Sequence, residues 1–177
     1  MKSIFYYMTD IGQIGIAEEA GSITNIFFEA DISLNQGKAL LKHKYEKREQ
    51  YNYINNYSIK ETDLLREANR QLYEYFQGKR QVFNLPLAPE GTPFMKNVWK
   101  CLCDIPYGET RSYKEIAIAA GNEKASRAVG NANNRNPIPI FIPCHRVIGS
   151  DGRLIGYRNG LPTKKLLLEI EKKYVNN

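Results

Sequence analysis

The sequence of 177 residues has few cysteines and no long apolar segment, and these absences narrow what the protein can be. Three cysteines are too few, and odd in number, for a disulfide framework, so reduced thiols in the cytoplasm are expected. No apolar run approaches the roughly 20 residues that a membrane span needs. The first residues also lack the apolar core of a signal peptide. We therefore expect a cytoplasmic protein without a membrane anchor.

The charge that is present gathers in one half of the chain. Hydrophobic residues make up 42% and charged residues 25%, a globular composition that argues against a disordered chain or a coiled coil. Residues 1–91 carry 11 Lys/Arg and 12 Asp/Glu, whereas residues 92–177 carry 14 and 7. The basic second half indicates a polyanion such as nucleic acid as partner, although a solvated basic surface would have the same composition.

The first half of the chain alternates apolar and polar residues in short runs separated by turn residues. This alternation predicts an antiparallel sheet of about three strands, at residues 4–8, 14–17 and 23–28. A helix follows at residues 61–77, where apolar side chains recur at helical spacing before Gly78, a typical C-terminal capping residue. Residues 35–60 have no clear periodicity and predict no particular element.

A cluster of three prolines and two glycines between positions 78 and 93 indicates a break between two domains. We place an α/β domain with an antiparallel sheet at residues 1–85, a linker at 86–91 and a mainly helical domain at 92–177. In the second domain, Thr92 caps a helix and Ser112 begins another through a capping box. With a helix at 124–133 these form a helix-turn-helix, an outline that many helical domains share.

The helix expected at residues 124–133 combines small side chains with one long cation. Ala125 and Ser126 precede Arg127, and small residues follow. Small side chains let a helix backbone approach DNA closely, and one arginine can then reach into the base stack. Tight helix packing with an exposed arginine explains the same pattern, so both interpretations stay open.

A proline-rich segment before position 148 contains the pair Cys144-His145, and His145 is one of only two histidines. A thiol becomes a good nucleophile as the thiolate, so it needs a nearby base or positive field. The prolines favour an extended backbone, in which neighbouring side chains point to opposite faces. Contact between the two side chains therefore requires a bend or a bridging water.

The terminal helix, expected at about residues 163–174, offers a third group for this pair. Glu171 lies one turn after Leu167, at the edge of the apolar stripe, and a carboxylate facing inward needs a partner. Cys144, His145 and Glu171 therefore make a candidate relay of nucleophile, base and orienting group. The alternative is that Glu171 pairs with a nearby Lys or Arg.

The other cysteines, Cys101 and Cys103, do not predict a metal site. A C-x-C pair on a helix places its thiols on different faces, and no second pair has the spacing of zinc ligands. We expect neither a metal nor a cofactor. His43, in the polar stretch, is expected to be exposed.

Several short motifs between residues 91 and 171 occur in an order that is characteristic of one family. The most specific is Ile142-Pro143-Cys144-His145-Arg146-Val147, preceded by Asn136-Pro137-Ile138-Pro139. The others are Gly91-Thr92-Pro93-Phe94, Val98-Trp99, Ile105-Pro106-Tyr107-Gly108-Glu109-Thr110, Ser112-Tyr113, Arg127-Ala128-Val129-Gly130 and Gly160-Leu161. In these motifs the chain resembles the O6-alkylguanine-DNA alkyltransferases, also called methylated-DNA–protein-cysteine methyltransferases. The first half resembles their ribonuclease-H-like domain in outline.

This resemblance implies a winged-helix or helix-turn-helix domain that repairs DNA. The protein would bind duplex DNA from the minor groove, flip O6-alkylguanine out of the stack and transfer the alkyl group to its own cysteine. The transfer would be irreversible and occur once per molecule, and O4-alkylthymine is a second candidate lesion. The resemblance also implies a monomer without a cofactor. Zinc, which some members bind in the first domain, is not expected because residues 1–91 contain no cysteine and one histidine.

The resemblance also assigns roles to individual residues. Cys144 would accept the alkyl group, His145 would act as base through a water, Glu171 would orient His145, and Asn136 would brace the turn. The remaining assignments are base replacement by Arg127, nucleotide rotation by Tyr113, further DNA contacts by Ala125, Ser126, Arg111 and Arg135, and a substrate pocket formed by Tyr157, Arg158, Val147 and Pro139. Arg158 departs from the small residue of many members and makes the rim of the pocket more cationic.

Two other functions remain as alternatives to alkyl transfer. A non-catalytic protein could bind alkylated DNA and flag the damage, but the presence of Cys144 argues against it. A Cys-His-Glu hydrolase would turn over repeatedly, but it leaves the basic helix-turn-helix half unexplained.

Overall fold

The computed structural model describes residues 2–29, 31 and 56–175, so His43 and most of the stretch at 35–60 lie outside the described residues. The chain divides into two compact units. The first contains Met1–Tyr73 and Leu85–Ala88, and the second contains Glu74–Asn84 and Pro89–Asn177. The domain boundary at 86–91 remains a prediction. Within the described ranges, no helix has the length and apolar character to cross a membrane.

The first unit is built on an antiparallel meander, as the alternation of its sequence predicts. Strands β1 (Lys2–Thr9), β2 (Gly12–Glu19) and β3 (Ser22–Phe28) pair in sequence order. A two-residue strand that was not predicted, β4 (Ser58–Ile59), pairs in parallel with β1 at the edge of the sheet. Four consecutive residues of β2, Ile14 to Ala17, are buried, so both faces of the central strand are covered.

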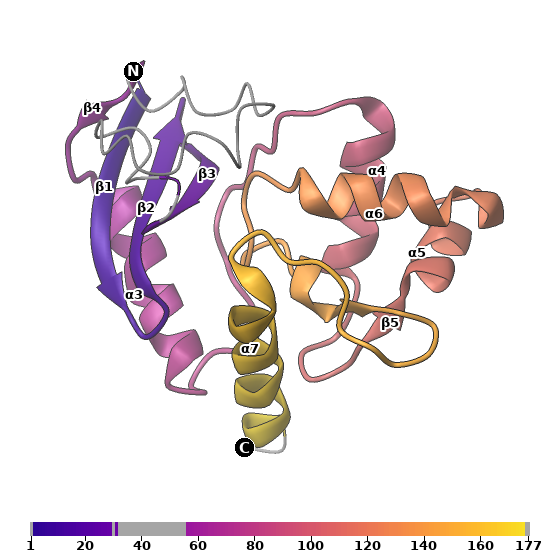
Figure 1. Cartoon of the computed structure of the whole chain (residues 1–177). Coiled ribbons are helices and arrows are strands. Elements are labelled where there is room, and N and C mark those ends of the chain that lie inside the picture. Colours follow the sequence, from indigo (N-terminus) through magenta and orange to yellow (C-terminus); the bar gives the residue numbers. More distant parts are fainter. Residues whose placement is uncertain (1, 30, 32–55, 176–177) are drawn as a thin grey trace, which may run out of the picture. The chain divides into compact units, whose positions relative to one another are not determined.

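Helix α3 (Asp63–Phe76) begins two residues later than predicted and ends before Gly78, whose φ of 69° lies in the left-handed region. Its apolar stripe is buried, including Leu65, Ala68 and Leu72. Figure 1 shows α3 beside the strands of the sheet. The spacing of these residues, three and four apart, places them on one helix face and thereby explains the burial.

The second unit is mainly helical. Helix α4 (Pro93–Cys103) is capped by Thr92, and α5 (Tyr113–Ala119) begins with the predicted capping box of Ser112 and Glu115. Where one helix was predicted at 124–133, a 3-10 turn, η3 (Glu123–Ala125), precedes α6 (Ser126–Asn134). The side chain of Asn122 caps η3, and this local start separates the turn from the helix.

The elements of the second unit meet around a polar as well as an apolar interior. Trp99, the single tryptophan, is buried and donates from Nε1 to the Ala132 carbonyl at 2.9 Å, linking α4 to α6 (Figure 1). Helix α7 (Gly160–Tyr174) begins three residues before the predicted start. The two-residue strands β5 (Arg111–Ser112) and β6 (Val147–Ile148) pair in parallel.

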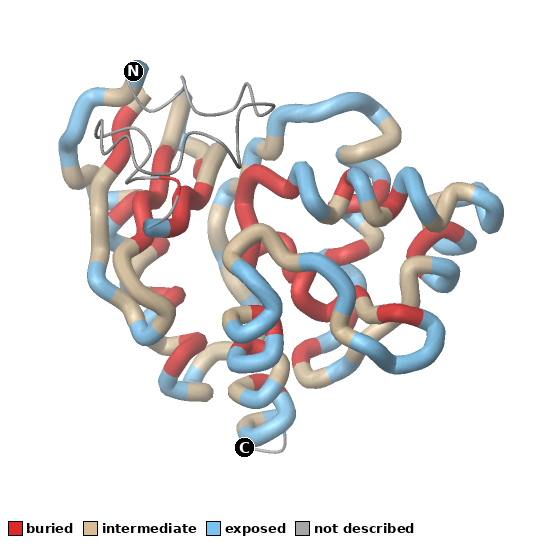
Figure 2. Tube along the Cα trace, viewed as in Figure 1, coloured by how far each residue is buried: buried red, intermediate tan, exposed pale blue. Residues whose placement is uncertain are grey.

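The proline-rich segment that leads to Cys144 is buried along its whole length (Figure 2). It is not simply extended. Ile140 has a φ of 77°, a conformation that a β-branched residue rarely adopts. A 3-10 turn, η4, then covers Cys144–Arg146, so Cys144 and His145 do not alternate as they would in a strand. The backbone therefore bends at Cys144, but within the described residues His145 Nδ1 has no hydrogen-bond partner, so the bend alone does not join the imidazole to the thiol.

Candidate active site

Hydrogen bonds from Asn136 hold the backbone in front of Cys144. Asn136 is buried; its Nδ2 donates to the Ile142 carbonyl at 2.9 Å, and its Oδ1 accepts from the Ile138 N–H at 3.0 Å. The N–H of Cys144 donates to the same Ile142 carbonyl at 2.8 Å. These bonds use backbone atoms and the Asn136 amide, and they fix the backbone at Cys144.

The Cys144 side chain lies in the wall of a cavity of about 300 Å³ within the second unit. Tyr113, at the start of α5, lines the cavity and donates from its hydroxyl to the Ile155 carbonyl at 3.0 Å. The full lining is Tyr113, Ser126, Gly130, Asn133, Asn134, Cys144, Ile155, Gly156, Tyr157 and Arg158. The cavity thus brings together the thiol, the first residues of α5 and α6, and the loop before α7.

Behind Cys144, the imidazole of His145 binds the carboxylate of Glu171. His145 Nε2 lies 2.7 Å from Glu171 Oε1, and both side chains are fully buried. The carboxylate is an acceptor, so the geometry places the imidazole proton on Nε2. His145 Nδ1 is buried and has no hydrogen-bond partner among the described residues. Nδ1 is therefore the nitrogen that can accept a proton.

Glu171 has more partners than the sequence indicated. Arg146 donates to both oxygens, with Nε at 2.9 Å from Oε2 and a terminal nitrogen at 3.0 Å from Oε1. Tyr75, on the last turn of α3, donates its hydroxyl to Oε1 at 2.8 Å, and the Gly108 N–H donates to Oε2 at 3.0 Å. The two predicted alternatives for Glu171, orienting His145 and pairing with an arginine, are thus both present in the geometry.

Burial and charge set the protonation states of this group. Burial raises the pKa of the Cys144 thiol, against the opposing effects of Asn136, Lys164 and Arg158. Burial also lowers the pKa of His145, despite its bond to Glu171. The thiol and the imidazole are both neutral at rest, because the raised pKa of Cys144 and the lowered pKa of His145 each favour the neutral form.

The Glu171 carboxylate, in contrast, is held in its charged form. Burial would raise the pKa of Glu171, but hydrogen bonds and charges from His145 and Arg146 hold it at about 2. Glu171 is therefore ionised throughout the physiological range. Its negative charge is shared between a neutral imidazole and a permanent guanidinium.

Lys164 is a buried group near Cys144 that the sequence analysis did not identify. This lysine of α7 is fully buried, and its Nζ donates to the carbonyls of Val147 at 2.6 Å and Ile155 at 2.9 Å. Burial lowers its pKa to about 8, while the nearby Cys144 opposes the shift. The signal was present in the sequence, since Lys164 precedes Leu167 by three positions on the buried stripe of α7.

The predicted DNA-binding residues have different environments. Arg127 lies exposed in the first turn of α6, with no hydrogen bond or ion pair to the described residues. Arg135, at the C-terminal end of α6, is also exposed. Arg111 pairs with Glu109 at 2.8 Å, Ala125 ends η3, and Ser126 lines the cavity.

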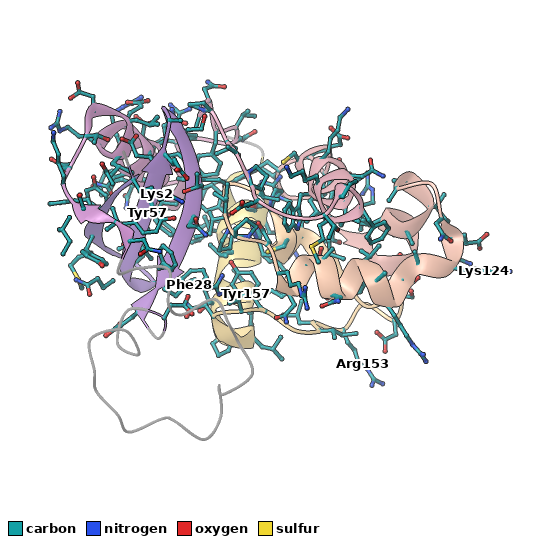
Figure 3. The ribbon with its side chains drawn as sticks, turned by 90° about the horizontal axis from the view of Figure 1, so that it is seen from above. Lys2, Phe28, Tyr57, Lys124, Arg153 and Tyr157 are labelled. Atoms are coloured by element: carbon teal, nitrogen blue, oxygen red, sulfur yellow. The ribbon has the colours of Figure 1, made fainter. Side chains whose placement is uncertain are left out.

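Of the predicted pocket residues, Tyr157 and Arg158 line the cavity, whereas Val147 and Pro139 do not. Tyr157 is marked in Figure 3. Val147 is fully buried in β6, and its carbonyl accepts from Lys164. Among the residues that the structure describes, no group of three or more His, Cys, Asp and Glu side chains could hold a metal ion.

The second unit thus places a buried thiol in the wall of a cavity, with the His145–Glu171 pair behind it. Two family models match the chain: the ribonuclease-like domain of 6-O-methylguanine DNA methyltransferase over residues 4–89, and its DNA-binding domain over residues 93–173. The chain belongs to the 6-O-methylguanine DNA methyltransferase family. The predicted family and fold class are thereby confirmed.

Named relatives agree with this assignment. The chain is 63% identical over 114 residues to a methylated-DNA–protein-cysteine methyltransferase of Methanosarcina barkeri, covering 64% of this chain and 72% of the relative. It is 45% identical to the constitutive enzyme of the same name from Bacillus subtilis, covering 93% and 92%. These matches place the chain in the enzyme class of methylated-DNA–protein-cysteine methyltransferases.

A solved structure extends the comparison to DNA. The fold matches that of Mycobacterium tuberculosis OGT in complex with DNA with a TM-score of 0.78 and 37% identity, covering 97% of this chain and 94% of the other. Together with the DNA-binding family model, this likeness makes DNA the partner of the chain. The basic character of the second half is explained by that partner.

Proposed function

We propose that this enzyme repairs O6-alkylguanine in duplex DNA by one irreversible transfer of the alkyl group to Cys144. The observation that carries the proposal is the position of the thiol, in the wall of a cavity of about 300 Å³ with the His145–Glu171 pair behind it. A cavity of this size accommodates a flipped base rather than a paired one. O4-alkylthymine is a second candidate lesion for the same cavity.

The reaction follows from the protonation states of the site. The neutral Cys144 thiol gives its proton to His145 Nδ1 through a bridging water, and Glu171 stabilises the imidazolium that forms. The sulfur attacks the alkyl carbon, the C–O6 bond breaks, and its electron pair goes to the base. The proton that His145 took from Cys144 then passes to the guanine, so that S-alkylcysteine and guanine are the products. The alkyl group stays on Cys144, and each molecule acts once.

Access to the lesion requires base flipping. We assign the replacement of the flipped base to Arg127, because its guanidinium is exposed and unpaired at the start of the small-residue helix α6. The approach is from the minor groove, where such helices can lie close to the backbone. Tyr113 and Tyr157 bound the cavity that receives the base, and Arg158 adds positive charge to its lining.

Intact-mass analysis tests the transfer. The protein is incubated with duplex DNA containing one O6-methylguanine, and peptides are then mapped. We expect one added methyl group per protein, located on Cys144, and none on Cys144→Ala. Tight binding of the lesion without a mass change would instead make the chain a damage-recognition protein, and repeated turnover would make it a hydrolase.

The role of Arg127 is tested by comparing two substrates. Arg127→Ala should slow repair of paired duplex by about tenfold or more relative to single-stranded DNA, because extruding a paired base costs a few kcal/mol. The rates of methyl transfer on the two substrates measure this difference. Arg66→Ala, which removes an exposed arginine of α3, is the matched control and should affect both substrates little. Equal losses on both substrates would exclude base replacement by Arg127.

The same proposal includes the oligomeric state and the cellular location of the enzyme. It acts as a monomer inside the cell, where its DNA substrate is. The mass of the free protein in solution, measured by light scattering, checks the first statement.

A further inference from the structure

The Tyr75 hydroxyl donates to the same carboxylate oxygen that accepts a hydrogen bond from His145 Nε2. Its hydroxyl donates to Glu171 Oε1 at 2.8 Å and lies 3.4 Å from His145 Nε2, which itself is 2.7 Å from Oε1. Tyr75 is fully buried, and its ring packs against Phe83 and Tyr107. A buried hydroxyl in such a place has no access to water and depends on this one carboxylate for its hydrogen bond.

The position of this hydroxyl affects how strongly Glu171 attracts the imidazole proton. Each donor to a carboxylate stabilises its charge and makes it a weaker base. Tyr75 therefore reduces the tendency of Glu171 to hold His145 as an imidazolium, while it keeps Oε1 aimed at Nε2. Both effects leave Nδ1 unprotonated at rest.

We propose that Tyr75 is a positioning residue for methyl transfer, acting through Glu171 to hold His145 as the neutral tautomer whose Nδ1 receives the proton of Cys144. The role of Tyr75 in methyl transfer rests on the proposed function. Tyr75 belongs to the second unit, although it stands in the last turn of α3, before the segment of motifs at residues 91–171. Tyr75 does not touch the cavity, so its effect is indirect.

Other groups around His145 also influence its charge. Lys164 and Arg146 are cations that disfavour the imidazolium, and Glu171 favours it. Substituting Tyr75 leaves Lys164 and Arg146 in place and removes one donor from Glu171. The titratable and charged groups that face the His145–Glu171 pair are Tyr75 from α3, Tyr107 from the segment after α4, Cys144 and Arg146 from η4, Tyr157 from the loop before α7, and Lys164 from α7.

The matched pair of variants is Tyr75→Phe and Tyr107→Phe. Both remove one hydroxyl from a buried tyrosine, and the two rings are in edge contact at 6.0 Å. The Tyr107 hydroxyl has no hydrogen-bond partner within the described residues, whereas that of Tyr75 donates to Glu171. Any difference between the variants therefore reports the hydrogen bond rather than the loss of a hydroxyl.

The first readout is the titration of His145 by NMR, with ¹⁵N-labelled histidine. The chain has two histidines, so His43→Gln leaves a single ring to observe. In Tyr75→Phe the titration midpoint should rise by about half to one pH unit, because Glu171 becomes a stronger base. In Tyr107→Phe it should stay within about 0.2 unit of the parent, a difference smaller than one lost hydrogen bond produces.

The second readout is the single-turnover rate of methyl transfer as a function of pH. In Tyr75→Phe the acidic limb should move to higher pH, which slows transfer about three- to tenfold on that limb and less at alkaline pH. A loss that is uniform with pH, or an unchanged His145 midpoint in a folded variant, overturns the proposal. If Tyr75→Phe does not fold, the parent protein decides: an Nδ1–H tautomer of His145 contradicts the proposal and an Nε2–H tautomer supports it. Failure of the parent to accept a methyl group would overturn the proposed function, while the NMR titration still tests the hydrogen bond.

Discussion

The two compact units bury different kinds of side chain. In the described part of the first unit, the buried core is apolar, with residues such as Ile4, Ile14 and Leu72, and Asp31 is its one buried charged group. The second unit also has an apolar core, but it buries a larger set of polar and charged side chains as well. That set is Asn136, His145, Arg146, Lys164 and Glu171.

This difference separates two sources of constraint on the sequence. Apolar burial stabilises a fold in proportion to area, and one apolar side chain can replace another of similar volume. Buried charges stabilise only with their partners in place, and each loss leaves another charge uncompensated. The first unit should therefore tolerate volume-conserving changes, whereas the second should respond to single changes of charge at constant shape.

Replacing Glu171 by Gln should have the largest combined effect. The substitution keeps the shape but leaves Arg146 buried without its counter-charge, and we expect a loss of about 3–5 kcal/mol of stability. Transfer should also slow by about a hundredfold, since the imidazolium loses its stabilising charge. Urea unfolding and single-turnover kinetics measure the two effects.

The parent protein provides a further check through acid unfolding. The folded pKa of Glu171 is depressed to about 2, so its contribution to stability is present above the ordinary carboxyl pKa and is lost as the pH falls through about 2. Glu171→Gln should lack this component. If the parent and the variant lost stability in parallel between pH 5 and 2, the charge pairing would not be a source of stability.

A change in the first unit should affect stability without affecting chemistry. Ile16, in the middle of β2, is fully buried, and Ile16→Ala should cost about 2–5 kcal/mol of the free energy of unfolding. The rate of transfer by the folded fraction should remain that of the parent. Ile16→Val is the graded control, with an expected cost of about 0.5–1.5 kcal/mol. A transfer rate that fell with either variant would show that the first unit takes part in the reaction.

Lys164 should alter both the pH dependence of stability and the transfer reaction. Its folded pKa of about 8 lies below the ordinary lysine value, so the parent gains stability as the pH rises from about 8 to 10.5, by up to about 3 kcal/mol. Lys164→Met should lose this pH dependence. It should also slow transfer, because the carbonyls of Val147 and Ile155 lose their shared donor and Cys144 loses a nearby cation. Comparing the stability of the parent and the variant at pH 7.5 and 10 measures the first effect, and an identical change in both would contradict it.

The sequence predicted elements whose pattern is local. The alternation in residues 4–28 and the capping box at Ser112 identify the meander and α5, because the signals lie within the elements themselves. Strand β4 was not predictable in this way, since two exposed residues have no periodicity and pair with β1 through backbone atoms. The 3-10 turn at Cys144 was missed because prolines favour an extended backbone over a short range.

The site was predicted in part for a similar reason. Cys144, His145 and Glu171 were found because each is chemically unusual in its surroundings, although their catalytic roles remain a proposal. Tyr75 and Lys164 were missed because both follow the apolar stripe of a helix, where a tyrosine or a lysine stem is ordinarily part of the core. Only the three-dimensional structure brings the Tyr75 hydroxyl to Glu171, across 96 residues of sequence.

The hydrogen bond between Trp99 and Ala132 has a practical consequence for optical experiments. Trp99 is the single tryptophan of the chain, and its indole is buried against α6, the helix that carries Arg127. Indole emission depends on the polarity around the ring and on its hydrogen bond, so a displacement of α6 alters the spectrum. The unlabelled protein therefore contains its own fluorescent reporter, a single tryptophan next to the helix that we propose contacts DNA.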